Sequence, residues 1–272
     1  MSEVWGGVSG RITEKTIVEA VPHILEKSAV CVPPSTLLEK ICHFLFATSH
    51  YQDGVVVVED GTVIGRLGGQ HILWQVRENI RNLKSKPVSE IMEKIPIEFS
   101  ENRVLLEVLE LFKKNRFCFA PIKTKEGKIV SLSAMDLLSL VANMKINIPV
   151  RTIYSKMIFV SEGIQIKDAL DIMFNNKIRR LGIESDTEPL RIINDRDILE
   201  YLCFIQVLEE DVLIKKIDHI RSQQITNIHP NTSISSAAEL LMANPPACSV
   251  DKHYIITPYD IVNKTILSQV QV

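Results

Sequence analysis

The sequence has 272 residues, of which 46% are hydrophobic, and its formal net charge is −2 at pH 7. A chain of this length and hydrophobicity can bury two cores, which excludes extensive disorder. The nearly balanced charge gives no basic field for a nucleic-acid backbone and argues against nucleic-acid binding. The sequence shows neither a signal-peptide pattern nor an apolar run of about 18 residues, so we expect a cytoplasmic protein without membrane contact.

The cysteines and histidines are scattered along the chain and form no recognisable site. The five cysteines, none of them in a C-x-x-C pair, predict buried thiols in a reducing compartment. They are Cys31, Cys42, Cys118, Cys203 and Cys248. Because no His/Cys spacing is typical of a zinc site, we expect neither a metal nor a cofactor.

Residues 1–25 form an N-terminal extension whose amphipathic stretch, "EKTIVEAVPHIL" (14–25), is predicted to pack on the outside of the domain that follows. Four similar segments occur further along the chain. They are "TVIGRLGGQHILWQV" (62–76), "KIVSLSAMDLLSLV" (128–141), "RIINDRDILEYL" (191–202) and "YIITPYDIVNKTI" (254–266). Each is a short β-type run, a small or polar residue, a polar residue three positions later and an apolar helix.

The last polar residues of these segments are His71, Asp136, Asp197 and Asp260, which are 65, 61 and 63 residues apart. This spacing predicts a fourfold repeat with boundaries at 26–80, 81–144, 145–206 and 207–272. The first helices are predicted at 36–49, 104–115, 164–176 and 233–244, and the strands after them at 54–60, 118–124, 179–184 and 247–253. A strand is also predicted at 156–160. Each repeat is therefore βαββα, and the fold class is α+β.

A unit of this length and element order resembles the CBS domain, named for cystathionine β-synthase. In the third copy, "IRRLGI" and "IINDRDIL" nearly spell the family signature, and "IITPYDIV" in the fourth copy is close to it. The resemblance covers nearly all of residues 26 to 268. It implies two pseudo-twofold modules, roughly 26–144 and 145–270, whose clefts often hold an adenosine nucleotide. The chain is similar to stand-alone four-copy proteins, among them archaeal CBS-domain proteins and the γ subunit of AMP-activated kinase.

A nucleotide site needs a carboxylate for the ribose diol, cations or helix-start N–H groups for phosphate, and an apolar slot for adenine. The resemblance assigns residues to each task. Ribose falls to Asp136, Asp197 and Asp260, the helix entrance to Ser133, Asn194 and Thr257, phosphate to Arg179 and Arg180, and the adenine slot to Ile158 and Ile255. Ile178 and Tyr259 are further expected nucleotide-binding residues. Because family clefts mix two repeats, Thr257 and Asp260 are expected to act with Ile158, Ile178 and Arg179.

Three repeats depart from the family pattern. The first has Gly68 and His71 at the helix start, and the basic pair is replaced by Cys118 and Phe119 in the second copy and by "PPA" (245–247) in the fourth. The resemblance therefore places most binding capacity in the C-terminal half. The N-terminal half is structural or binds weakly through Asp136.

The same residues have simpler interpretations. Thr257, Pro258 and Asp260 form a good helix start, as do Ser133 and Asp136, and a cap can coexist with an anion site. Arg179 and Arg180 are either solvated charge or phosphate ligands. The neighbouring charges, Asp195 and Arg196, are predicted to be plain surface charge.

The sequence contains no nucleophile elbow and no phosphate-binding P-loop, so we expect a binding protein and not an enzyme. The leading hypothesis is a regulatory protein that binds AMP, ADP or ATP and signals the energy state to a protein partner. The alternative is a ligand-free scaffold or dimerisation protein in which these motifs only cap helices. The sequence does not identify the partner or the physiological nucleotide, and it leaves homodimer formation open.

Overall fold

The structure is a computed structural model that describes residues 14–47, 54–79, 83–95, 99–115, 119–184, 190–204, 210–244 and 247–267. The chain divides into two compact units. Unit 1 comprises Met1–Ala29, Ile97–Lys156 and Thr226–Val272, and unit 2 comprises Val30–Pro96 and Met157–Ile225. Each unit therefore combines segments from both halves of the sequence. The predicted α+β class is confirmed.

Unit 1 contains two of the predicted βαββα repeats and the N-terminal extension. Its second repeat is formed by β5 (Phe99–Ser100), α5 (Leu105–Asn115), β6 (Phe119–Lys123), β7 (Ile129–Ser133) and α6 (Ala134–Asn143). Its fourth repeat is formed by β13 (Thr226–Ile228), α9 (Ile234–Ala243), β14 (Cys248–Val250), β15 (Tyr254–Ile256) and α10 (Pro258–Thr265). Outside these lie α2 (Ile17–Ala20), β8 (Ser155–Lys156) and 3-10 turns at Pro22–Glu26 and Val150–Thr152.

Unit 2 contains the first and third repeats. The first is formed by β1 (Val30–Val32), α3 (Leu38–Ala47), β2 (Gly54–Glu59), β3 (Thr62–Gly68) and α4 (Gly69–Asn79). The third is formed by β9 (Phe159–Val160), α7 (Ile166–Asn175), β10 (Arg180–Ile183), β11 (Arg191–Asn194) and α8 (Asp195–Phe204). Outside these lie β4 (Glu93–Lys94), β12 (Gln223–Gln224) and 3-10 turns at Leu83–Ser85, Val88–Glu90, Glu210–Val212 and Ile217–His219.

The last helix of every repeat begins where the repeated motif predicts. The helices α4, α6, α8 and α10 start directly after Gly68, Ser133, Asn194 and Thr257, respectively. In three repeats the strand runs straight into the helix, and in the fourth Thr257 alone separates β15 from α10. Ser133 and Thr257, for example, have φ values of −122° and −124°. This is the backbone geometry that N-cap residues adopt.

Each hairpin of second and third strands is extended by a segment that precedes a different repeat. In unit 2, β4 pairs with β3 and β12 pairs with β11, both antiparallel. In unit 1, β8 pairs with β15. The segment that follows the N-terminal extension runs beside β7, where the Ala29 N–H donates to the carbonyl of Ile129 at 3.0 Å. We call these four segments, around residues 27–29, 93–94, 155–156 and 223–224, the edge segments.

The prediction of one continuous strand at 156–160 is wrong. It is two separate strands, β8 and β9, interrupted at Met157 and Ile158. The reason is that the chain leaves unit 1 after Lys156 and enters unit 2 at Met157. One apolar run therefore supplies strands to two different sheets.

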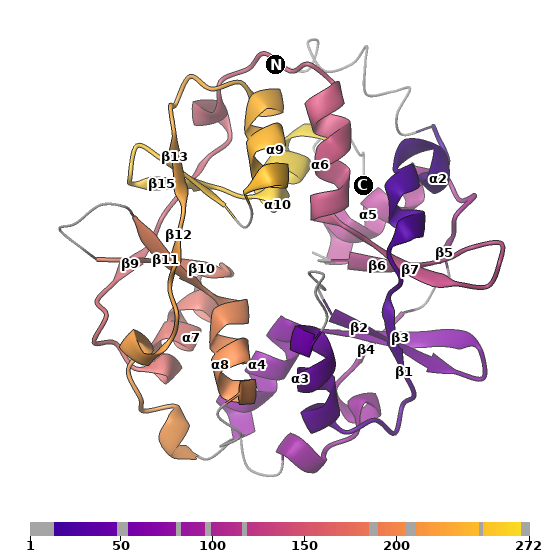
Figure 1. Ribbon diagram of the computed structural model, residues 1–272, viewed down its shortest axis with the longest axis horizontal. Helices are drawn as coiled ribbons and strands as arrows, with labels where there is room; N and C mark the ends of the chain where they lie inside the picture. The colour runs from indigo at the N-terminus through magenta and orange to yellow at the C-terminus, as the bar shows by residue number, and fades with distance from the viewer. Residues whose placement is uncertain are drawn as a thin grey trace. The chain divides into compact units, whose positions relative to one another are not determined.

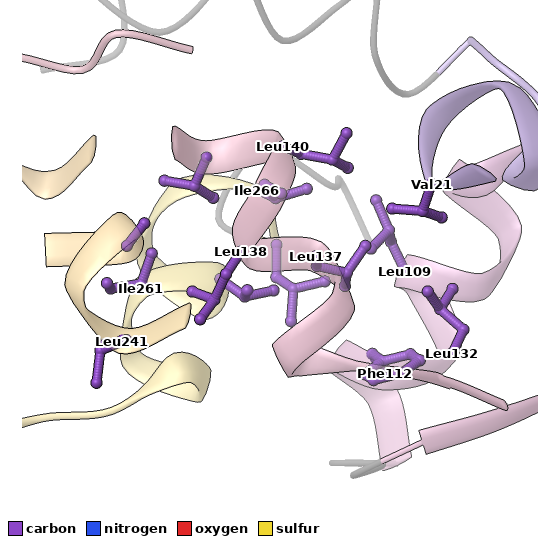
Figure 2. Packing of buried hydrophobic residues seen from close by; sticks show 14 of the residues in the cluster. Val21, Leu109, Phe112, Leu132, Leu137, Leu138, Leu140, Leu241, Ile261 and Ile266 are labelled. Carbon is purple, nitrogen blue, oxygen red and sulfur yellow. The ribbon is translucent and has the colours of Figure 1, made fainter. Parts of the chain in front are cut away.

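The core of unit 1 is built from helices of both of its repeats. In Figure 1, α6 lies beside α9 and α10, and these helices are in contact. Figure 2 shows Leu138 of α6 near Ile261 of α10, and Leu137 facing Leu109 of α5. The extension also enters this core, since Ile17 and Val21 are fully buried. It is thus an integral part of unit 1 and more than an outer covering.

The core of unit 2 has the same plan. Helix α8 contacts both α3 and α4, and α4 also contacts α7. The side chains of Ile72, Leu73, Ile198 and Leu199 are buried between them. Among the residues that the structure describes, no helix combines the length and the hydrophobicity needed to cross a bilayer.

Candidate functional site

Each predicted ribose aspartate uses only one of its two oxygens to cap the helix. The Oδ2 atom of Asp136 accepts from the Ser133 N–H at 2.9 Å. The Oδ2 atom of Asp197 accepts from the Asn194 N–H at 2.8 Å, and that of Asp260 from the Thr257 N–H at 2.9 Å. The capping interpretation is correct, but the cap uses only Oδ2, which we call the inner oxygen. The outer oxygen, Oδ1, is directed elsewhere.

The outer oxygen meets a side chain from the edge segment beside its sheet. In the second repeat this side chain is Lys27, in the third it is Gln223, and in the fourth it is Ser155. The first repeat has the same plan with histidine in place of aspartate, and its edge residue is Glu93. The four sites therefore share one geometry, and they differ in the chemistry of the residue that faces the outer atom.

The second-repeat site is closed by a cation of the chain itself. Lys27 Nζ lies 2.5 Å from Asp136 Oδ1, and His23 Nε2 lies 3.5 Å from the same oxygen. Asp136 is only 4% exposed. Burial alone would raise the pKa of Asp136, but hydrogen bonds from His23, Lys27 and Ser133 outweigh burial and lower the pKa to about 2. Lys27 thus bonds the oxygen that the resemblance assigns to a ribose hydroxyl.

The third-repeat site is closed by an amide. Gln223 Nε2 donates to Asp197 Oδ1 at 2.5 Å, and Asp197 is 8% exposed. Burial raises the pKa of Asp197 to about 6, because the bonds from Asn194 and Gln223 offset the desolvation only in part and the nearby Asp195 adds to it. The surroundings of Asp197 therefore disfavour the charged form of its carboxylate.

Histidine preserves the cap in the first repeat. The Nδ1 atom of His71 accepts from the Gly68 N–H at 3.1 Å, as a carboxylate oxygen does in the other repeats. Its Nε2 atom lies 3.7 Å from Glu93, which is bound in turn by Arg66. Burial lowers the pKa of His71, and Glu93 only partly opposes that shift. A neutral imidazole cannot replace a carboxylate that accepts two ribose hydroxyls.

The fourth-repeat site is the most open of the three aspartate sites. The outer oxygen of Asp260 accepts a hydrogen bond from the Ser155 hydroxyl at 3.0 Å, and both side chains are accessible to solvent. Thr257 Oγ1 donates to the inner oxygen at 2.6 Å and accepts from the Asp260 N–H at 3.2 Å. A hydroxyl can rotate away from the carboxylate or bond a ligand together with it, whereas the ammonium of Lys27 neutralises its aspartate.

The predicted phosphate residues lie in unit 2. Arg179 precedes β10 and its Nε atom donates to Asp195 Oδ2 at 2.7 Å, while Arg180 is the first residue of β10. The prediction that Asp195 is plain surface charge is wrong, since this residue is 6% exposed and holds Arg179. Arg196 also makes specific contacts. It donates to the Leu45 carbonyl at 3.0 Å and lies over the ring of Phe46.

The remaining residues of the predicted nucleotide site are divided between the units. Ile158 and Ile178 are half-buried in unit 2, while Ile255 and Tyr259 belong to unit 1 together with Thr257 and Asp260. The grouping of these residues into one cleft stays a prediction. Of the substituted basic positions, Phe119 and Ala247 are buried, and Cys118 and residues 245–246 lie outside the described residues.

Neither the partners of the outer oxygens nor a hollow in unit 2 could be inferred from the sequence. The hollow has a volume of about 250 Å³ and lies beside the start of α4. It is lined by Gln70, His71, Trp74, Gln75, Ile91 and Phe174. Within the described part of the chain, no group of three or more His, Cys, Asp or Glu residues could hold a metal ion.

Comparison with known proteins finds a family match for part of the chain. Residues 150–203, which include β9 to most of α8, match the CBS domain family model. The match covers most of the predicted third repeat, 145–206. The predicted recognition is therefore confirmed. A curated relative, the uncharacterized protein MJ1426 of Methanocaldococcus jannaschii, is 26% identical over 152 residues, covering 42% of this chain and 90% of the relative.

Solved structures share the fold over most of the chain. Protein MJ1225 of Methanocaldococcus jannaschii, described as a proposed archaeal homologue of γ-AMPK, is 20% identical with a TM-score of 0.74, covering 90% of this chain and 99% of its own. An uncharacterized conserved protein from Pyrococcus horikoshii is 15% identical with a TM-score of 0.51, covering 78% and 91%, respectively. At these identities the likeness concerns the fold, which extends well beyond the matched CBS domain.

We expect Asp136→Asn to destabilise the protein at neutral pH. The pKa of Asp136 is lowered on folding, so its contribution is present above the unfolded pKa near 3.8 and is lost as the pH falls towards about 2. The loss should be about 2 kcal/mol at pH 7 and should shrink below pH 4. Urea unfolding at several pH values measures this difference. Glu110→Gln, at an exposed position of α5, is the control, and an equal effect of both variants would contradict the assignment.

Asp197→Asn should have the opposite effect. The folded pKa of Asp197, about 6, exceeds the unfolded value near 3.8, so its ionised form opposes folding. This destabilisation is complete above pH 6 and absent below pH 3.8. The variant should therefore be more stable than the parent at pH 7 to 8, by up to about 3 kcal/mol, and equally stable near pH 3.5. Thermal and urea unfolding across this range test the sign. Destabilisation at pH 8 would show that the charged form is favoured in the fold.

Proposed function

We propose that the protein is a regulatory protein that binds AMP, ADP or ATP and passes the energy state of the cell to a protein partner. The observation that carries this proposal is the state of Asp260. Its inner oxygen is held by the helix start and its outer oxygen faces only a hydroxyl among the described residues, Ser155. The carboxylate is thus fixed in position and remains able to accept bonds from a ribose diol.

The helix start adds to the suitability of this position. Asp260 lies in the first turn of α10, whose backbone N–H groups and dipole favour negative charge. A phosphate or a carboxylate near this end is therefore stabilised by the fold itself. Ile255 on β15 provides apolar surface two residues before Thr257. The family resemblance assigns ribose and adenine to these residues, and the geometry of unit 1 is compatible with both tasks.

The differences among the repeats favour binding at the fourth. Asp136 is neutralised by Lys27, and Asp197 is covered by Gln223, so a ligand would have to displace a bond of the chain at either position. At Asp260 the competing group is one hydroxyl. The similarity of fold to protein MJ1225, described as a proposed homologue of γ-AMPK, supports a regulatory role without catalysis. Signalling would arise from a shift between bound and free conformations.

The alternative, a ligand-free scaffold, rests on the caps alone. Capping explains the inner oxygen of each aspartate but not the accessibility of the outer oxygen of Asp260. A scaffold would also show no nucleotide-dependent stability. Binding at 100 times Kd should stabilise the protein by about 2.7 kcal/mol, which is measurable as an increase in Tm with AMP or ATP but not with CTP or UTP.

Replacing Asp260 by alanine should weaken adenosine, AMP and ATP binding alike, because all three carry the ribose. Losing a charge-assisted bond should raise Kd by about tenfold or more. Isothermal titration calorimetry on the full chain measures this change. Asp136→Ala is the matched control, since it removes an equivalent helix cap whose outer oxygen is already occupied. Unchanged affinity in Asp260→Ala would mean that this residue only caps the helix, and it would favour the hypothesis of a ligand-free scaffold.

Replacing Arg179 and Arg180 together by alanine should distinguish phosphate contact from structural charge. If they bind phosphate, Kd should rise about tenfold or more for AMP and ATP and little for adenosine. Because Arg179 holds Asp195, the variant should also lose stability, so affinities must be compared where the protein is folded. Arg196→Ala, at a neighbouring arginine with other contacts, is the control. Equal losses for AMP and adenosine would contradict a phosphate role.

A further inference from the structure

The sheet β13-β14-β15-β8 of unit 1 has one face against the core and one face that leads to Asp260. On the core side lie Cys248, Val250 and Ile256, all of which belong to the buried cluster of unit 1. Side chains alternate along a strand, so Ser249 and Ile255 point to the other face. These two residues are directly opposed across β14 and β15. Residues opposed in this way share a face.

The row continues to the candidate site. Ile255 is opposed on its other side by Ser155 of β8, and the Ser155 hydroxyl bonds the outer oxygen of Asp260. Ser155, Ile255 and Ser249 thus lie side by side on three neighbouring strands. Because strands are about 4.8 Å apart, Ser249 is roughly 10 Å from Ser155 along the row. This is the order of the length of a nucleoside from its ribose hydroxyls to the far edge of its base.

Ser249 has a property that the fold does not require. It is 0% exposed, and its hydroxyl has no hydrogen-bond partner among the described residues. A buried hydroxyl without a partner destabilises a protein, so each such group calls for an explanation. Ser249 pairs with the residue two positions before the helix cap. The residue that pairs in this way in the other repeats is Val56, Pro121 or Gly182. Three repeats therefore form this strand without a polar side chain.

We propose that the Ser249 hydroxyl binds the edge of the base of the nucleotide whose ribose is held by Asp260. This inference rests on the proposed function and extends it to the base. Ile255 lies between the two polar groups and provides the apolar surface on which the base rests. A serine hydroxyl can donate to a ring nitrogen or accept from an amino group, so it matches a purine edge. The third repeat cannot make this contact, because a side chain at Gly182 would collide with Met157 and Phe159.

The test is Ser249→Ala in the full chain, with ligand affinity and unfolding measured on the same samples. Kd for adenosine and AMP should rise roughly 2- to 10-fold, as expected for the loss of one neutral hydrogen bond. Kd for ribose 5-phosphate, which lacks the base, should not change. Without ligand, the variant should melt at a higher temperature than the parent, because an unsatisfied buried hydroxyl has been removed.

Ser235→Ala is the matched control within unit 1. The Ser235 hydroxyl donates to the Val141 carbonyl and accepts from the Ile146 N–H, so its loss should lower the melting temperature and leave the affinity unchanged. If Ser249→Ala binds adenosine as well as the parent, or weakens ribose 5-phosphate equally, the proposed base contact is overturned while the nucleotide site stands. If the parent binds neither adenosine nor AMP, the proposed function and this inference are both overturned.

Discussion

The site depends on a carboxylate that caps a helix with one oxygen and leaves the other oxygen for a different partner. In three repeats an aspartate gives its inner oxygen to the strand-to-helix junction and leaves its outer oxygen for another partner. The inner bond satisfies an N–H group that the helix cannot satisfy itself. It also fixes the side-chain rotamer, so the outer oxygen is held in place before any ligand arrives. A ligand that binds there need not order the side chain, which reduces the entropic cost of binding.

The edge segments then decide what each preorganised carboxylate can do. Lysine neutralises its aspartate and lowers the pKa, glutamine leaves its aspartate in an environment that disfavours charge, and serine leaves the outer oxygen exchangeable. Similar caps can therefore become a structural ion pair or the proposed binding site through one residue of an edge segment. This arrangement lets the repeats diverge in function while the fold stays the same.

Local features of the fold were predictable, and long-range ones were not. The four helix starts follow from a strand, a capping residue and an apolar helix, all within about ten residues, and the sequence predicts each of them correctly. The partners of the outer oxygens come from far along the chain, with 109 residues between Lys27 and Asp136 and 105 between Ser155 and Asp260. Edge pairing of short strands leaves no periodicity from which these contacts could be inferred.

Asp195 shows why charge alone misled the sequence interpretation. It stands between two motif residues in a polar stretch, yet its carboxylate is buried and holds Arg179 from the preceding strand hairpin. A buried ion pair of this kind is costly to break because the remaining charge loses its partner. Arg179 is therefore oriented by a fixed partner, whatever its proposed role towards phosphate, as Asp260 is oriented by its helix. A charged group held in place by one bond thus occurs in both units: the cation Arg179 in unit 2 and the anion Asp260 in unit 1.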